Sequence, residues 1–181
     1  SKNFIFWGRL HQQKGLDRAI EIFNRIKLIS PESKFFIIGP DGGEEKNLKN
    51  LVSKLQLETS VEFCGEMNFK EIKQLVKDAS FYLQPSILEG MAMSVVEAMQ
   101  LGLVPIVTPV GEINNYCVNK FNAILIDKNN LFLEDVNKLL FNHDRYMNIR
   151  KNAINSWTSN KIYHKSVYSA SSELMSLANV D

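Results

Sequence analysis

The chain has 181 residues, of which 45% are hydrophobic and 23% are charged. That length is typical of one domain with its own apolar core, and that composition excludes a largely disordered protein. The formal net charge of +1, from 21 basic and 20 acidic residues, argues against a nucleic-acid-binding protein, which needs a surplus of Lys and Arg.

The predicted elements alternate between apolar runs of strand length and segments with helical spacing. Strand-like runs cover residues 3–7, 34–38, 61–64, 81–83, 104–107 and 123–126. Segments with helical spacing cover residues 16–26, 48–55, 69–77 and 94–100, and two or three more lie between residues 133 and 178. Alternation of this kind implies right-handed crossovers, and strands this apolar are covered on both faces. The sequence therefore predicts an α/β fold with a doubly wound, mainly parallel sheet, as in Rossmann-like domains.

The most polar part of the chain is its last segment, residues 156–181. Its apolar residues form only a thin stripe at helical spacing: Ile162, Val167, Leu174 and Leu177. We expect a helix there that packs on the edge of this domain or on a partner domain.

The segment after the first strand carries two cations, Arg9 and Lys14, in a loop that leads into a helix near Leu16. Ligands of doubly wound sheets bind at the carboxyl ends of the strands, and cations beside a helix start attract phosphate. A solvated loop with two surface cations is the alternative interpretation. His11 in the same loop is expected to take no part in chemistry.

The segment after the fourth strand contains two carboxylates, Glu89 and Glu97, eight residues apart. On one continuous helix they would lie about 12 Å apart at 1.5 Å per residue, too far to hold one small group. Gly90 favours a loop around Glu89, and Ser94 is a good N-cap residue. We therefore expect Glu89 in a loop and Glu97 in the first turn of a helix.

The start of that helix is expected to offer free backbone N–H groups at Met93, Ser94 and Val95. This layout suits a nucleotide sugar: Glu97 would accept hydrogen bonds from vicinal ribose hydroxyls, the helix start would bind phosphate, and Glu89 would face the sugar. The alternative is structural, because Ser94 and Glu97 also match a capping box and Glu89 can be an ordinary loop carboxylate. The local pattern leaves both interpretations open.

Taken together and in order, these motifs resemble the retaining glycosyltransferases of the GT-B fold, specifically family four ("glycosyl transferases group 1"). The matching pieces run from Phe4 to about Leu140. They are Gly8-Arg9-Leu10 with Lys14-Gly15, Ile37-Ile38-Gly39, Phe63-Cys64-Gly65, Pro85-Ser86 with Glu89-Gly90, Glu97-Ala98-Met99 and Gly102-Leu103-Val104-Pro105-Ile106.

The resemblance implies that residues 1–181 are one nucleotide-sugar-binding domain, the carboxy-terminal half of a two-domain enzyme. It implies catalytic roles for Arg9 and Lys14, which hold the diphosphate, and for Glu89, which faces the donor sugar. Glu97 holds the ribose. The remaining donor-binding groups are expected at Gly8, Gly90, Met91, Ala92, Met93, Ser94 and Val95, with Gly65 and Met67 near the base.

The resemblance also implies a reaction, the retaining transfer of a hexosyl group to an acceptor hydroxyl. The donor is expected to be a UDP- or GDP-linked sugar, with no other cofactor and no metal, because Arg9 and Lys14 neutralise the diphosphate. The acceptor is a glycan or a lipid-linked sugar, and its domain is absent from this chain. We expect a cytoplasmic protein that is peripheral at the inner membrane face through that absent half. The chain alone is expected to bind nucleotide but to transfer little or nothing.

Two departures from the family pattern leave the sugar open. Asn115 stands where the family loop after the fifth strand has Glu, and Ala123 replaces a usual Gly.

Two other functions remain as alternatives. A sugar-nucleotide epimerase of the same fold would hold the nucleotide in the same way. A non-catalytic module such as a flavodoxin-like receiver would need acidic residues where Arg9 and Gly65 stand.

Overall fold

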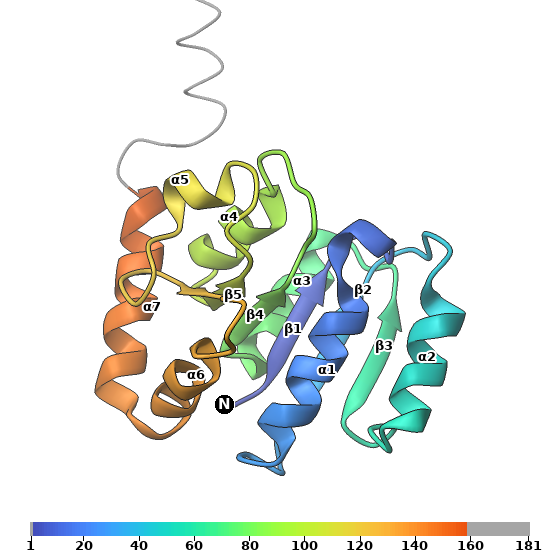
Figure 1. Ribbon diagram of the computed structural model, residues 1–181. Helices are drawn as coiled ribbons and strands as arrows, with labels where there is room; N and C mark the ends of the chain where they lie inside the picture. Colours follow the sequence, from blue (N-terminus) through green and yellow to red (C-terminus); the bar gives the residue numbers. More distant parts are fainter. Residues whose placement is uncertain (1, 159–181) are drawn as a thin grey trace, which may run out of the picture.

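The computed structural model describes residues 2–158, which form an α/β domain around one parallel sheet (Figure 1). The helix predicted for the polar segment falls on residues 159–181 for most of its length and lies outside the described residues. Among the described residues, no helix is both long enough and apolar enough to cross a bilayer.

The sheet of the described residues has six strands in the order β3-β2-β1-β4-β5-β6, with every pair parallel. The strands are β1 (Phe4–Trp7), β2 (Phe35–Ile38), β3 (Val61–Gly65), β4 (Phe81–Gln84), β5 (Val104–Val107) and β6 (Ile124–Leu125). This order confirms the predicted doubly wound fold. The direction of strand addition reverses between β1 and β4, which makes the gap between their carboxyl ends the switch point of the sheet.

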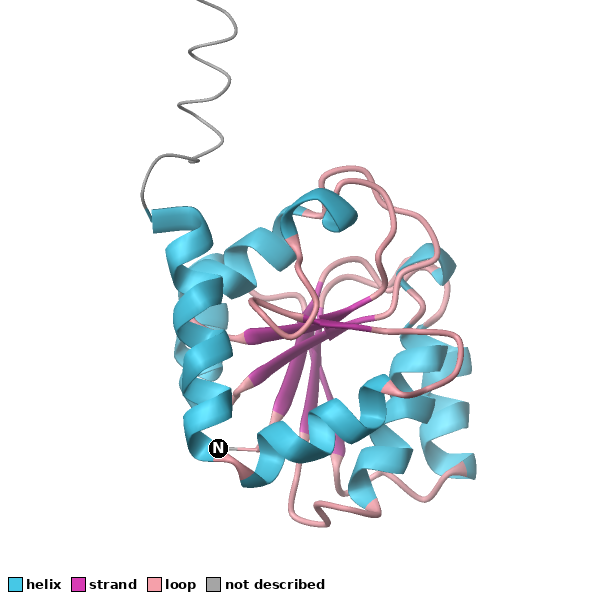
Figure 2. Cartoon of the chain, turned by 60° about the vertical axis from the view of Figure 1, so that its left-hand side comes forward, coloured by secondary structure: helices cyan, strands magenta, loops and turns pink. Residues whose placement is uncertain are grey.

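Helices cover both faces of the sheet (Figure 2). They are α1 (Leu16–Lys27), α2 (Glu45–Lys54), α3 (Phe69–Leu75), α4 (Met93–Gln100), α5 (Ile113–Tyr116), α6 (Phe132–Phe141) and α7 (His143–Thr158). The described residues also form two 3₁₀ turns, η1 (Gln12–Lys14) and η2 (Val76–Asp78). In Figure 1, α1 and α2 lie in front of the sheet and α3 behind it.

The predicted boundaries are close to the observed ones, with small differences. The helix expected at 69–77 ends as α-helix at Leu75 and tightens into η2, while the strand expected at 123–126 is only the two-residue β6. The start of α3 is fixed locally, because Asn68 and Glu71 form a capping box.

Four strands, β1, β2, β4 and β5, are buried along their whole length and build the core. All four residues of β1 are buried, and its first ring, Phe4, stacks on Phe81 with ring centroids 4.9 Å apart. Phe23 of α1 packs edge-on against Phe4 at 5.7 Å. Truncating a buried aromatic residue such as Phe4 to Ala typically costs about 3–5 kcal/mol. This packing holds β1 and β4 side by side and so fixes where their carboxyl ends lie.

Candidate functional site

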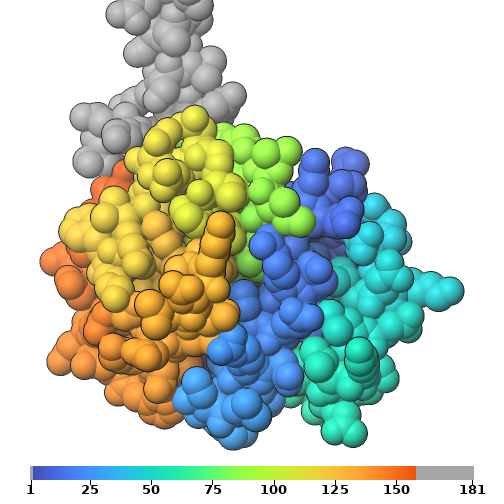
Figure 3. Space-filling view, viewed as in Figure 1, coloured from blue at the N-terminus to red at the C-terminus, as the bar shows by residue number. Residues whose placement is uncertain are grey.

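Two loops meet at the switch point, one from β1 to α1 and one from β4 to α4. The backbone N–H of Ile87 donates to the carbonyl of Gln13 at 2.8 Å, which joins them directly. A third loop, after β5, is attached where the N–H of Glu112 donates to the carbonyl of Gly90 at 3.1 Å. In the space-filling view the blue, green and yellow segments that carry these loops meet at one end of the molecule (Figure 3).

Gly15 allows the first two loops to come this close. Its φ is +65°, and a Cβ there would overlap the carbonyl oxygen of Pro85, at the start of the second loop. The Arg18 guanidinium donates to that same oxygen. Any other residue at position 15 would be strained and would push the loops apart.

Lys14 and Glu89, predicted as separate ligands for phosphate and sugar, form an ion pair. Lys14 Nζ lies 2.7 Å from Glu89 Oε1, and the two side chains are 25% and 7% exposed. The residues lie 75 positions apart in the chain and meet because β1 and β4 are neighbours. Their binding roles remain predictions; what the structure gives is a shielded carboxylate with a cation against it.

Glu97 lies on α4 with one carboxylate oxygen already engaged. The indole N–H of Trp7, at the end of β1, donates to Glu97 Oε2 at 2.9 Å. The capping-box alternative is wrong, because the side chain of Ser94 makes no capping bond and its hydroxyl donates to Gln84 Oε1 at 2.9 Å. A tertiary partner from β1 outcompetes the local backbone for this carboxylate.

The start of α4 also differs from the prediction. The N-cap residue is Ala92, which has φ +51°, so the expectation that Ser94 is the N-cap is wrong. Glu97 accordingly lies just past the first turn. The N–H of Val95 is not free, since it donates to the carbonyl of Ala92 at 2.9 Å. Within residues 2–158 the N–H groups of Met93 and Ser94 have no hydrogen-bond acceptor, so two of the three predicted amides are available.

The loop from Gly90 to Ala92 is exposed at Gly90 and is supported from behind by Tyr116. The hydroxyl of Tyr116 donates to the carbonyl of Met91 at 2.8 Å. The same α5 segment holds Asn115, whose amide donates to Glu112 Oε2 at 2.8 Å. The residue that departs from the family pattern therefore makes a local contact in the loop adjoining Gly90.

Arg9 is exposed at the carboxyl end of β1. No hydrogen bond or ion pair to its guanidinium is found within the described part of the chain, so its charge is available. Its side chain lies along Gly42 in the loop after β2. Gly8, just before it, is held by a bond from its N–H to the carbonyl of Ile38 at 3.0 Å.

Gly65 and Met67 lie at the same edge of the sheet, beyond β2. The carbonyl of Gly65 accepts from the N–H of Gly39 at 2.8 Å, and Met67 packs partly buried against the core. Within residues 2–158, no hydrogen bond or ion pair joins either residue to Arg9, Glu89 or Glu97. His11, by contrast, has a local structural role, as its Nδ1 accepts from the N–H of Gln13 at 3.3 Å.

Sequence reasoning missed the residues that support the two carboxylates. Gln84 Nε2 and Ser86 Oγ both donate to Glu89 Oε1, at 2.8 and 2.7 Å. Tyr82 lies beneath them, with its hydroxyl 2.5 Å from Gln84 Oε1. A signal was available: Tyr82 and Gln84 are polar residues two apart in a short apolar strand, which places both on one face.

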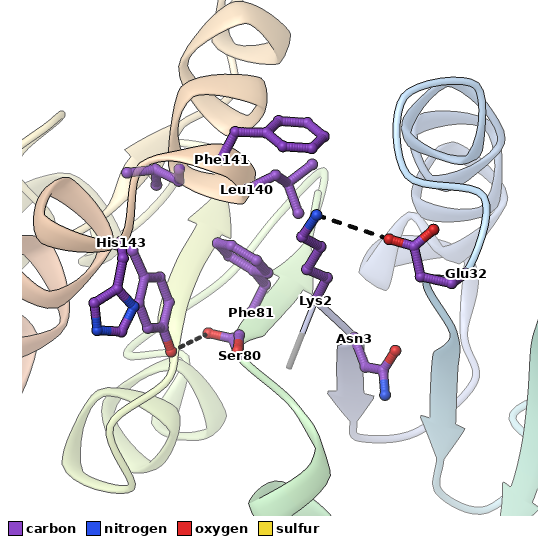
Figure 4. Close-up of a pocket in the computed structure, with 10 residues that line it drawn as sticks. Lys2, Asn3, Glu32, Ser80, Phe81, Leu140, Phe141 and His143 are labelled. Atoms are coloured by element: carbon purple, nitrogen blue, oxygen red, sulfur yellow. Dashed lines mark hydrogen bonds and ion pairs between the residues drawn. The ribbon is translucent and has the colours of Figure 1, made fainter.

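A hollow of about 510 Å³ opens at the opposite, amino edge of the sheet (Figure 4). It is lined by Ser80 and Phe81 at the start of β4 and by Phe141, and Lys2 pairs with Glu32 across it at 3.7 Å. The length of the strands separates it from Glu89 and Glu97. In the described part of the chain, no cluster of three or more His, Cys, Asp or Glu side chains is arranged to hold a metal ion.

Fold and site together define a Rossmann-like α/β domain whose charged side chains gather at the switch point of the sheet. The chain matches the family model of "Glycosyl transferases group 1" over residues 1–156, and it belongs to that family. It is 31% identical over 153 residues to an uncharacterized glycosyltransferase of Haemophilus influenzae, covering 81% of this chain and 42% of that protein.

Two solved structures share the fold. The C-terminal domain of a glycosyl transferase group 1 family protein from Francisella tularensis aligns with a TM-score of 0.76 at 20% identity, covering 87% of this chain and 85% of that one. Anabaena HepE in complex with UDP and glucose aligns with a TM-score of 0.82 at 19% identity, covering 96% of this chain and 48% of that one. The six-stranded domain is thus of the kind found in GT-B glycosyltransferases. The chain spans 25% to 42% of the length of three curated relatives that it matches.

Proposed function

We propose that this chain is the donor-binding domain of a retaining glycosyltransferase of family four, which transfers a hexosyl group from a nucleotide-diphosphate sugar to an acceptor hydroxyl. The observation that carries the proposal is the placing of Glu89 and Glu97 at the switch point of the sheet, where Trp7 of β1 holds Glu97 and Lys14 of the loop after β1 pairs with Glu89. Family membership and the UDP complex of the related Anabaena structure support it.

The diphosphate of the donor is proposed to bind between the exposed Arg9 and the start of α4. The free N–H groups of Met93 and Ser94 and the positive end of the helix dipole favour an anion there. Lys14 adds a second cation while it stays paired with Glu89. Negative charge grows on the diphosphate as it leaves. One preorganised donor of this kind typically lowers the activation free energy by about 2.7–4 kcal/mol.

The ribose is proposed to bind Glu97. One carboxylate oxygen is held by Trp7, so the other is left to accept from the vicinal ribose hydroxyls. Glu89 is proposed to face the donor sugar, and the loop from Gly90 to Val95 to line it. Retention is proposed to follow from attack by the acceptor hydroxyl on the face that the diphosphate leaves.

The acceptor, a glycan or lipid-linked sugar, is proposed to bind a further domain of the same protein. This proposal is supported by length, because the chain spans only 25% to 42% of three curated relatives. We therefore expect the isolated chain to bind donor and to show no measurable transfer. Turnover by the isolated chain would contradict that division of labour.

The test is a calorimetric panel of UDP-, GDP- and ADP-sugars, run on the unaltered chain and on Arg9→Ala and Glu97→Gln. Arg9→Ala is expected to weaken nucleoside diphosphate binding by about 1.5–3 kcal/mol, the value of a hydrogen bond to a charged group, with little change in the free energy of unfolding. Binding of one base series names the donor class, and no binding of any series refutes the proposal. A Glu97→Gln chain that binds nucleotide as well as the unaltered one refutes the ribose assignment.

A further inference from the structure

β4 places two polar side chains, Tyr82 and Gln84, beneath the site on one face of the sheet. Both are 0% exposed. Trp7 belongs to the same face, because Ile5, two residues before it, pairs with Tyr82. Burying polar groups costs free energy unless each has a hydrogen-bond partner. The partners of Tyr82 and Gln84 therefore show what these two buried side chains do.

The hydrogen bonds of Gln84 admit one orientation of its amide. Nε2 faces Glu89 Oε1 at 2.8 Å, where an ionised carboxylate can only accept, so the NH₂ group must be on that side. The amide oxygen then faces the hydroxyls of Tyr82 at 2.5 Å and Ser94 at 2.9 Å. Burial raises the pKa of Tyr82 well above its ordinary value, so this hydroxyl keeps its proton and remains a donor.

The array has a directional effect on Glu89. Its Oε1 accepts from three donors, Lys14, Gln84 and Ser86, at 2.7 to 2.8 Å. Among the described residues none donates to Oε2, which is therefore the oxygen left for a ligand. The carboxylate is held by one atom in one orientation.

The same layer reaches Glu97. The hydroxyl of Tyr82 also lies 3.1 Å from the carbonyl of Trp7, and the two rings pack edge to face at 4.5 Å. Trp7 in turn donates to Glu97. Tyr82 thus connects the supports of both carboxylates, although its single proton serves only one acceptor at a time.

We propose that Gln84 is a positioning residue for the donor sugar: oriented by Tyr82 and Ser94, it holds the Glu89 carboxylate with Oε2 toward the sugar. This inference rests on the proposed function. In this role, Gln84 makes the domain bind a sugar nucleotide more tightly than the free nucleotide. A residue that only stabilised the fold would not have this effect.

The experiment compares the affinity of the chain for UDP with its affinity for UDP-glucose, and GDP with GDP-mannose, by calorimetry. Gln84→Met removes the amide at nearly constant volume. It is expected to weaken the sugar nucleotide about tenfold and the free nucleoside diphosphate less than twofold. Tyr82→Phe, which deletes only a hydroxyl, is expected to weaken the sugar nucleotide about threefold in the same selective way and serves if Gln84→Met does not fold.

Tyr146→Phe is the matched control, because it deletes a hydroxyl that contacts the carbonyl of Ser80 at the opposite edge of the sheet. It is expected to change neither affinity. If the unaltered chain binds no nucleotide at all, the proposed function fails and this role fails with it. If the unaltered chain binds, but Gln84→Met weakens both ligands equally or neither, the positioning role is overturned while donor binding stands. An equal selective loss in Tyr146→Phe overturns it as well.

Discussion

Replacing Gly15 by Ala tests how closely the β1 and β4 loops must approach. Two costs add at this position. A left-handed backbone costs an L-residue about 1–2 kcal/mol, and the new Cβ overlaps the carbonyl oxygen of Pro85, for which overpacking costs roughly 1–3 kcal/mol more. Gly15→Ala is therefore expected to lower the free energy of unfolding by about 2–5 kcal/mol.

Gly65→Ala is the matched comparison. Gly65 has a similar φ of +70°, and a Cβ there meets nothing within 4 Å, so only the backbone cost applies. We expect it to lose about 1–2 kcal/mol. Both variants are measured by urea unfolding followed by tryptophan fluorescence, with the slope against urea checked for constancy. If the two substitutions cost the same, the close approach of the loops at Pro85 does not constrain position 15.

Two further predictions use other parts of the fold. The chain has two tryptophans, so a ¹⁵N-labelled sample should give two indole N–H resonances; Glu97→Gln should shift that of Trp7 and leave that of Trp157, which donates to a methionine sulfur. An unmoved Trp7 resonance would contradict the hydrogen bond. Asp41 accepts three backbone N–H groups at the start of α2, which lower its pKa, chiefly through the N–H of Glu45. Its stabilisation is therefore full above an unfolded-state pKa of about 3.9 and is lost as the pH falls through the lower folded-state value. The gap in melting temperature between the unaltered chain and Asp41→Ala should begin to shrink below about pH 4 and shrink further as the pH falls through the lowered folded-state pKa. A gap that stays constant from about pH 6 down to about pH 2 would count against the charge.

The alternation of apolar runs and helical spacing was sufficient to predict the sheet and its two covering layers. Strands such as β1 and β2 are buried on both faces, so they are continuous apolar runs. Such runs can be predicted as strands from the sequence without knowing which strands lie beside them. Right-handed crossovers then place the loops after β1 and β4 at one edge. The sequence thus located the region where Arg9, Glu89 and Glu97 lie.

The partners of those side chains were decided by tertiary structure. Ser94 and Glu97 fit a capping box in sequence. In the structure, however, Glu97 accepts a hydrogen bond from Trp7, 90 residues earlier, and Ser94 donates to Gln84. Lys14 meets Glu89 across 75 residues. A local pattern reports only which hydrogen bonds the nearby backbone offers. The hydrogen-bond partner of each side chain depends on the pairing of β1 with β4, because that pairing determines which donors lie at the carboxyl ends of these strands.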